Sequence, residues 1–157
     1  MEPWIITALE NGPKVFGRLL RVFPTDRIDE RVDKDRFTAR EVIAHLADYE
    51  QTVLERVSTA HHFSGKTVPS FDPDKNCVNH KYGEKNVFHE AEVFESRRQM
   101  TVEHLKGLTE DQLNSTFKIE GGREFSIQQY MMMISTHDME HLEQVSKYLA
   151  SEVATII

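Results

Sequence analysis

The chain has 157 residues, which fits one domain, and we expect a single domain over residues 1–157. Its net charge of -7, from 26 acidic against 19 basic side chains, argues against a nucleic-acid or anionic-membrane partner, because phosphate recognition relies on clustered Lys and Arg. The apolar runs fall short of the roughly 20 residues that a membrane span needs, and the lone Cys77 and the absence of signal-peptide features lead us to expect a cytoplasmic protein.

Glycine and proline are sparse, and four long segments show helical spacing of apolar residues. We therefore expect an all-α domain built as a four-helix bundle. The first helix is predicted from Pro3 to about Phe23, and residues 12–13 (Gly-Pro) are expected to kink or split it. The second is predicted to begin at the capping-box sequence of residues 38–41 (Thr-Ala-Arg-Glu) and to end near Ala60.

The third predicted helix covers roughly residues 86–108, with Glu95, Arg98 and Glu103 expected to face water. The connection before it, residues 61–85, is long and polar. Connections of this length in compact domains are often functional or cross over the fold. Its 25 residues can return along the outside of the bundle, so the second and third helices can run in the same direction.

A short β-hairpin is predicted for residues 117–125, because the Gly-Gly pair at its centre suits a tight turn that needs positive φ. The fourth helix is predicted to start directly after it, with Ser126 as the N-cap and Gln129 as the capping-box partner. This helix is expected to continue to about Ala150.

His137 and His141 are four residues apart on the fourth predicted helix, so their Cβ atoms lie about 6 Å apart on one face. Two imidazoles at that spacing can bind one metal ion, although solvated or core-packed rings show the same spacing. Both histidines belong to an apolar stripe that points inward, and this favours the metal site. The stripe consists of Tyr130, Ile134, His137, His141, Val145 and Tyr148.

His45 lies in the inward stripe of the second predicted helix, with Val42, Leu46, Tyr49, Val53 and Val57. A lone histidine in a core is usually a hydrogen-bonded core residue. If the second and fourth helices are antiparallel neighbours, however, His45, His141 and His137 lie at depths of about 10, 14 and 20 Å, close enough to converge. Three inward imidazoles suit one Zn²⁺, Ni²⁺ or Fe²⁺ and leave open coordination positions, as in catalytic sites.

Several polar residues near these histidines are candidates for supporting roles. Asp138 stands where a His-Glu-x-x-His zinc protease has its general base, but it is one methylene shorter, so that motif is not matched. Asp138, Asp48 and Glu50 are interpreted either as solvated helix charges or as groups that orient a ligand imidazole. Tyr49, in the inward stripe, is a further pocket candidate.

The remaining ionisable candidates are expected to play smaller parts. Of the five other histidines, His80 is predicted to line the mouth of a pocket, and the rest are expected at the surface: His61, His62, His89 and His104. Cys77 would need an activating base to act as a nucleophile, so a structural or idle role is expected for it.

Taken together, three stretches of the chain resemble the DinB superfamily of four-helix metal proteins. They are Pro13 with residues 23–24 (Phe-Pro), residues 37–50 (FTAREVIAHLADYE) and residues 137–145 (HDMEHLEQV). The resemblance covers nearly the whole chain and implies an up-down-down-up bundle with a crossover between the second and third helices. It also implies metal ligands at His45, His137 and His141, and a homodimer.

The resemblance further implies thiol transfer or thiol-dependent isomerisation, in which a metal lowers the pKa of a low-molecular-weight thiol. Our leading hypothesis is a metal-dependent enzyme that activates a thiol or water for attack on a small-molecule substrate. The alternatives are a metal-dependent hydrolase and a non-catalytic bundle that binds a metal or ligand under stress. The chain is shorter than the mycothiol-dependent isomerases of this superfamily. An open cleft with an ionisable partner would favour catalysis, and a sealed apolar site would favour structure.

Overall fold

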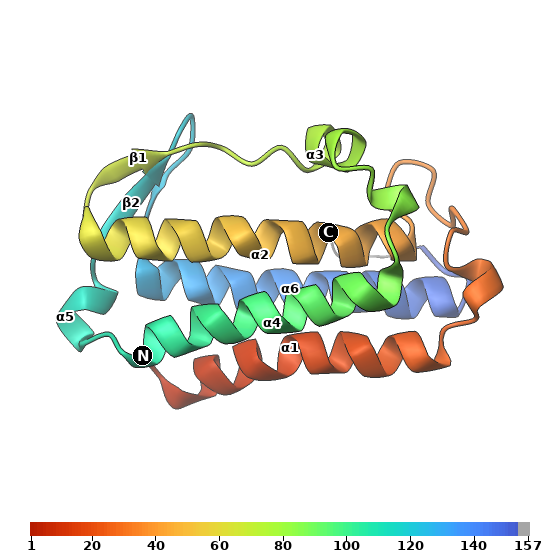
Figure 1. Ribbon diagram of the computed structural model, residues 1–157, viewed down its shortest axis with the longest axis horizontal. Helices are drawn as coiled ribbons and strands as arrows, with labels where there is room; N and C mark the ends of the chain where they lie inside the picture. The colour runs from red at the N-terminus through yellow and green to blue at the C-terminus, as the bar shows by residue number, and fades with distance from the viewer. Residues whose placement is uncertain (154–157) are drawn as a thin grey trace.

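The computed structural model describes residues 1–153 and contains four long helices that lie side by side (Figure 1). They are α1 (Pro3–Val22), α2 (Ala39–His62), α4 (Val87–Lys106) and α6 (Ile127–Leu149). Shorter helical segments are η1 (Thr25–Arg27), α3 (Pro73–Asn79), η2 (Tyr82–Glu84) and α5 (Glu110–Leu113). The mainly helical architecture predicted from the apolar spacing is therefore confirmed. No helix among the described residues is long and apolar enough to cross a membrane.

The direction of each helix can be followed in Figure 1. The helices α1 and α6 run one way along the bundle, and α2 and α4 run the other way. The segment between α2 and α4 returns along the outside of the bundle beside α2, and it carries a strand and the helices α3 and η2. This segment, expected to be a polar connection, thus contains regular structure of its own.

Capping boxes fix where α2 and α6 begin. The Thr38 hydroxyl accepts from the Glu41 amide at 3.2 Å, and the Glu41 carboxylate accepts from the Thr38 amide at 2.8 Å. Ser126 and Gln129 form the same pair of bonds at the start of α6. Amide groups that have no partner inside the helix are satisfied in this way, so both predicted start sites are confirmed.

A small three-stranded sheet closes one end of the bundle. The predicted hairpin is present as β2 (Thr116–Ile119) paired antiparallel with β3 (Glu124–Ser126), and Gly121 in its turn has a φ of 70°. The strand β1 (Lys66–Val68), from the crossover, pairs parallel with β2. The sequence did not predict this third strand, because three residues are too short to show alternation of apolar and polar side chains.

Pro13 lies inside α1, which runs unbroken from Pro3 to Val22, so the expectation that the helix splits there is wrong. A proline has no amide hydrogen, and the carbonyl four residues before it loses its helical partner. Here that carbonyl belongs to Leu9, and it accepts a hydrogen bond of 3.2 Å from Nη1 of Arg98 on α4. A side chain from a neighbouring helix therefore compensates for the missing bond.

A polar layer crosses the middle of the bundle between two apolar clusters. One cluster includes Leu9, Val57, Leu105 and Tyr130, and the other includes Phe16, Ile43, Phe94 and Tyr148. Each long helix passes from one cluster to the other through residues of the polar layer. These residues are Gly12 on α1, His45, Tyr49 and Glu50 on α2, Arg98 and Thr101 on α4, and His137, Asp138, His141 and Gln144 on α6.

Arg98 was expected to face water, but only 2% of it is exposed. Its guanidinium binds Glu50 at 2.8 Å and Asp138 at 2.6 Å, and Glu50 also accepts from the Thr101 hydroxyl. The apolar spacing of α4 could not reveal this, because a buried charge with buried partners has the same sequence signature as a solvated one. The network joins α2, α4 and α6 at the level of the histidines.

Candidate metal centre

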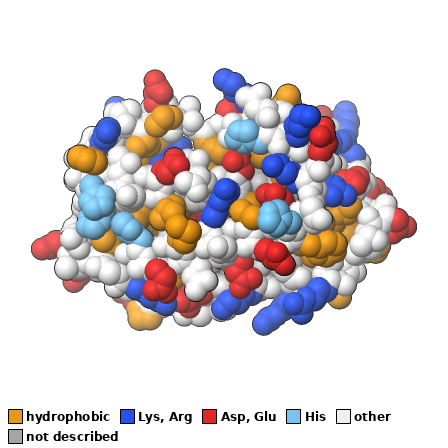
Figure 2. Space-filling view, in the orientation of Figure 1, with side chains coloured by type: hydrophobic (Ala, Val, Ile, Leu, Met, Phe, Trp, Pro, Cys, Tyr) orange, Lys and Arg blue, Asp and Glu red, His pale blue; other side chains and the backbone are white. Residues whose placement is uncertain are grey.

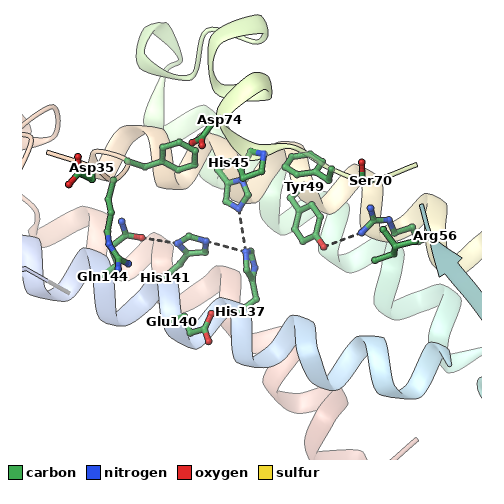
Figure 3. A pocket seen from close by; sticks show the side chains of 15 residues that line it. Asp35, His45, Tyr49, Arg56, Ser70, Asp74, His137, Glu140, His141 and Gln144 are labelled. Atoms are coloured by element: carbon green, nitrogen blue, oxygen red, sulfur yellow. Dashed lines mark hydrogen bonds between the residues drawn. The ribbon is translucent and has the colours of Figure 1, made fainter. Parts of the chain in front are cut away.

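Three imidazoles of the polar layer, from the antiparallel helices α2 and α6, meet at one place (Figure 3). Nε2 of His137 lies 3.3 Å from Nε2 of His45 and 3.1 Å from Nε2 of His141. Each of the three residues brings a ring nitrogen within 4.8 Å of the others. The convergence expected from the two stripes is therefore present, and these three form the one such group of metal-ligating side chains within residues 1–153.

Gln144, one turn after His141, sets the tautomer of that ring. The amide of Gln144 donates to the Tyr148 hydroxyl at 2.8 Å, which directs its carbonyl oxygen to Nδ1 of His141 at 2.9 Å. His141 therefore donates from Nδ1 and presents the lone pair of Nε2 to the other two rings. An outer partner of this kind is what fixes a metal-binding histidine in most metal sites.

Burial keeps the three rings neutral. Loss of hydration, with a smaller contribution from the neighbouring His141, lowers the pKa of His45 to about 3 and that of His137 to about 2. Burial also lowers the pKa of His141, against the opposing effect of the Gln144 bond. Neutral imidazoles keep a lone pair at pH 7, which is the form that binds a metal ion.

The separations between the rings fit a single ion. Nitrogen ligands at about 2.0–2.1 Å from a metal lie roughly 2.8 to 3.4 Å from one another at octahedral or tetrahedral angles. The two Nε2 contacts fall in this range. Three neutral nitrogen donors suit Zn²⁺, Ni²⁺ or Fe²⁺. His45, His137 and His141 thus meet the chemical requirements of a divalent metal site.

A cavity of about 480 Å³ opens beside the three histidines. Phe37 and Phe71 form apolar parts of its wall, and Tyr49, Arg56 and Glu140 contribute polar groups. The Tyr49 ring stacks on His45, with centroids 5.7 Å apart and planes 9° apart. Tyr49 therefore lies in the cavity wall beside His45. The cavity has the size of a small-molecule pocket.

Asp48 and His80, two other candidates, bind each other at the crossover segment between α2 and α4. Oδ2 of Asp48 accepts hydrogen bonds from Nδ1 of His80 at 2.9 Å, from the Asn76 amide and from the Tyr82 hydroxyl. These bonds fasten α3 and η2 to α2. His80 is half-exposed at this anchor and does not belong to the cavity wall.

The Asp138 carboxylate is bound by Arg98. Both of its oxygens accept from Arg98, at 2.6 and 3.1 Å, and only 4% of the residue is exposed. Within residues 1–153, the hydrogen bonds of Asp138 therefore go to a buried guanidinium and not to a ligand imidazole. Glu50 shares the same cation. The two carboxylates fix how α2 and α6 face each other.

The remaining histidines and the cysteine lie elsewhere. A second histidine group lies where α2 ends, and Figure 2 shows histidine side chains gathered at that end of the molecule. Nδ1 of His61 is 3.2 Å from Nε2 of His104, and His62 stacks on His61. These three do not bring three ligand atoms together as the first group does. Burial raises the pKa of the half-buried Cys77 thiol, which disfavours a nucleophilic thiolate.

Three residues of the site were not identified from the sequence. Gln144 follows His141 by three residues, so its place on the same helix face could have been noticed. Arg56 follows Tyr49 by seven, which also keeps it on the face of the inward stripe. Glu140 follows His137 by three residues, so the same spacing could have indicated its place in the cavity wall.

Comparisons with known proteins agree with this picture. YfiT from Bacillus subtilis, described as a probable metal-dependent hydrolase with an unusual four-helix bundle topology, superposes with a TM-score of 0.84 at 15% sequence identity, covering 96% of this chain and 90% of that one. A mycothiol-dependent maleylpyruvate isomerase superposes with a TM-score of 0.69 at 14% identity, covering 97% of this chain and 60% of that one. A search of curated proteins found no match. The sequence profile of the DinB superfamily matches residues 8–145, so the chain belongs to the DinB superfamily.

Proposed function

We propose that the protein is a metal-dependent enzyme that transfers a low-molecular-weight thiol to a small electrophile. One observation carries this proposal: three neutral imidazoles, those of the buried His45 and His141 and the half-buried His137, converge at the wall of an open cavity. A sealed site would suit a structural ion. A cavity beside the ligands leaves room for a co-substrate and a substrate, as in catalytic metal sites.

The chemistry of the donor set favours an anionic sulfur. A divalent ion held by three neutral imidazoles would keep its full +2 charge and would lower the pKa of a thiol or of water. His45, His137 and His141 would hold the ion, and Gln144 would keep the His141 lone pair turned toward it. Phe37 and Phe71 would shield the reacting groups from bulk water.

In the transfer itself, the thiol sulfur forms a bond to an electrophilic carbon while the bond from that carbon to its leaving group breaks. The thiol gives up its proton to solvent, and the leaving group departs with the electron pair. This reaction needs no general base directly beside the metal ligands. The site agrees with this, because the nearby carboxylate of Asp138 is bound by Arg98 and is not available as a base.

Hydrolysis is the second candidate, and Glu140 favours it. This carboxylate lines the cavity next to His141 and could accept the proton of an attacking water. The description of YfiT as a probable metal-dependent hydrolase points the same way. A non-catalytic role in metal or ligand binding is favoured least, because the cavity holds the ionisable groups of Tyr49, Arg56 and Glu140.

The test is a panel of thiols against halo-aromatic, epoxide and ester substrates, with protein loaded with Zn²⁺, Ni²⁺ or Fe²⁺ and with metal-free protein as control. We expect thiol conjugation that needs metal and falls to background in His45→Ala. The matched control is His104→Ala, which removes a histidine outside the site and should keep the activity.

Glu140→Gln separates the two candidate reactions. Thiol transfer should change little, whereas hydrolysis that uses this carboxylate as a base should fall by roughly 100-fold or more. Ester hydrolysis without any thiol, lost in Glu140→Gln, would replace thiol transfer by the second candidate. Metal-loaded protein with neither activity would favour the non-catalytic role.

A further inference from the structure

Two arginines are fully buried in or near the polar layer, and only one of them has carboxylate partners within residues 1–153. Arg98 is 2% exposed and forms ion pairs with Glu50 and Asp138. Arg56 is 3% exposed, and within residues 1–153 no carboxylate forms an ion pair with it. A guanidinium stays charged at any physiological pH. A buried positive charge is normally paired, so Arg56 lacks an expected counter-charge.

The contacts of Arg56 use only part of its donor capacity. Nη1 donates to the hydroxyls of Tyr49 at 3.2 Å and Tyr130 at 3.1 Å, and Nη2 donates to the Pro69 carbonyl at 2.9 Å. All three acceptors are neutral. Nε is buried and has no acceptor. A guanidinium has five N–H groups and binds a carboxylate through two of them side by side.

The hydroxyl of Tyr49 is a further hydrogen-bond donor beside Arg56. Their hydroxyl oxygens lie 3.1 Å apart, and both accept from Arg56. Tyr130 is fully buried, and burial raises the pKa of its hydroxyl, so it keeps its proton. The Tyr49 oxygen is the acceptor within reach of that proton. The proton of the half-buried Tyr49 is then free to be donated into the cavity, whose wall includes both Tyr49 and Arg56.

Arg56 and the histidines lie on either side of the same aromatic ring (Figure 3). The guanidinium carbon of Arg56 is 5.8 Å from the Tyr49 ring centroid, and the His137 ring centroid is 5.3 Å from it. A small molecule that spans one aromatic ring therefore reaches from the histidines to the guanidinium. The carboxylates of the cavity wall, Asp35, Asp74 and Glu140, have no ion pair with Arg56.

We propose that Arg56 and the Tyr49 hydroxyl form a binding site for a carboxylate group, carried by the same small molecule whose thiol or electrophilic end lies at the three histidines. The ligand supplies the counter-charge that the protein omits at Arg56. Tyr130 is a positioning residue, since it orients the Tyr49 hydroxyl. The proposed function underlies this inference, which adds that the substrate or thiol co-substrate is a carboxylic acid.

The test compares two thiols that differ in charge. Cobalt-loaded protein is titrated with 3-mercaptopropionate and with the uncharged 2-mercaptoethanol, and the sulfur-to-cobalt absorption band reports binding. We expect 3-mercaptopropionate to bind at least tenfold more tightly. The preference should fall below twofold in Arg56→Gln and by roughly threefold to tenfold in Tyr49→Phe. The matched control is Arg97→Gln, because Arg97 binds a backbone carbonyl outside the cavity wall.

Equal affinity of the wild-type protein for the two thiols would overturn the carboxylate site while leaving the proposed function intact. If Arg56→Gln does not fold, Tyr49→Phe decides, and an unchanged preference in that variant contradicts the site. If neither thiol produces the band, the proposed thiol chemistry fails. Calorimetry on metal-free protein with glutarate and its neutral diamide then decides: binding of glutarate alone, lost in Arg56→Gln, supports the carboxylate site, and any other result overturns it.

Discussion

Gly12 of α1 lies against Asp138 of α6 so closely that a Cβ atom at position 12 would be 2.6 Å from Oδ2 of Asp138. The same carboxylate binds Arg98, which also caps the free carbonyl of Leu9. The absence of a side chain at Gly12 thus lets α1 approach the ion network that joins α2, α4 and α6.

Gly12→Ala is therefore expected to destabilise the protein by about 1–3 kcal/mol, the usual effect of overfilling a packed interior. Gly17→Ala on the same helix provides the control, because a Cβ there meets nothing within 4 Å. Replacing a helical glycine by alanine in open space should stabilise the protein by up to about 1 kcal/mol. Urea unfolding of both variants measures the difference. Equal effects of the two substitutions would show that the close approach to Asp138 is unimportant.

Purified protein is expected to bind about one divalent ion per chain. His137→Ala or His141→Ala should reduce metal affinity far more than His61→Ala, His62→Ala or His104→Ala, because only the first group places three nitrogens together. Elemental analysis after loading with Zn²⁺, Ni²⁺ and Fe²⁺ measures the stoichiometry. Less than a tenth of an ion per chain after loading would reject the metal site, and equal losses in the two groups would reject the ligand assignment.

Gln144→Ala should reduce metal affinity by roughly tenfold or more, the range typical of residues that orient a metal ligand. Its carbonyl oxygen is the group that holds His141 in the required tautomer. Tyr148→Phe removes the hydrogen bond from Gln144 to the Tyr148 hydroxyl but keeps the carbonyl oxygen of Gln144 that binds His141, so it should have a smaller effect. Competition with a chelator of known affinity measures both variants. A larger loss in Tyr148→Phe would contradict this role of Gln144.

The helices and the histidine site could be predicted because their signals are local and periodic. The capping pairs at Thr38 and Ser126 lie within four residues of their partners, and the apolar stripes repeat every turn. His45, His137 and His141 belong to those stripes, so the same periodicity brought them together. The length of the connection over residues 61–85 already allowed the second and third helices to run in the same direction, and the superfamily resemblance implied the same arrangement.

The rest depends on contacts between distant parts of the chain. The pairing of β1 with β2 joins residues about 50 positions apart, and the three residues of β1 alone carry no pattern that predicts it. Arg98 and Arg56 both lie on predicted helices, yet Arg98 has two buried carboxylate partners, and Arg56 has none within residues 1–153. Asp48 was a candidate partner for a ligand ring, but it binds α3 and η2 in the crossover. Such pairings become visible only when the helices are placed against each other.

A homodimer is expected from the superfamily resemblance, and we predict that it forms through faces of the bundle helices. Trp4 on α1 and Met132 and Met139 on α6 are large apolar side chains exposed on two such helices. Light scattering at tens of micromolar should report twice the chain mass of 18.2 kDa. Met139→Glu should shift the equilibrium toward monomer, with Met100→Glu on α4 as a control at another exposed methionine. A monomer in wild-type protein would reject the prediction.

The last prediction concerns acid. In metal-free protein, burial holds the pKa of His45 at about 3 and that of His137 at about 2. In an unfolded chain the pKa of a histidine is about 6.5. The unfolded state therefore binds more protons than the folded state between these values. Stability is fully present above about pH 6.5 and is lost as the pH falls toward the folded values.

At pH 5 the loss should be about 2 kcal/mol for each of these two histidines, since one pKa unit corresponds to about 1.4 kcal/mol. Urea unfolding of metal-free protein at pH 8 and pH 5 measures it. In the double variant His45→Gln with His137→Gln, the pH-dependent difference should shrink, because a glutamine side chain does not titrate. A bound divalent ion competes with protons for the same nitrogens, so the metal-loaded protein should keep its stability to lower pH and then lose metal and fold together. If the stability of the metal-free wild type does not change between pH 8 and pH 5, these rings are hydrated in the folded protein. That outcome would contradict a site in which His45 and His137 stay neutral.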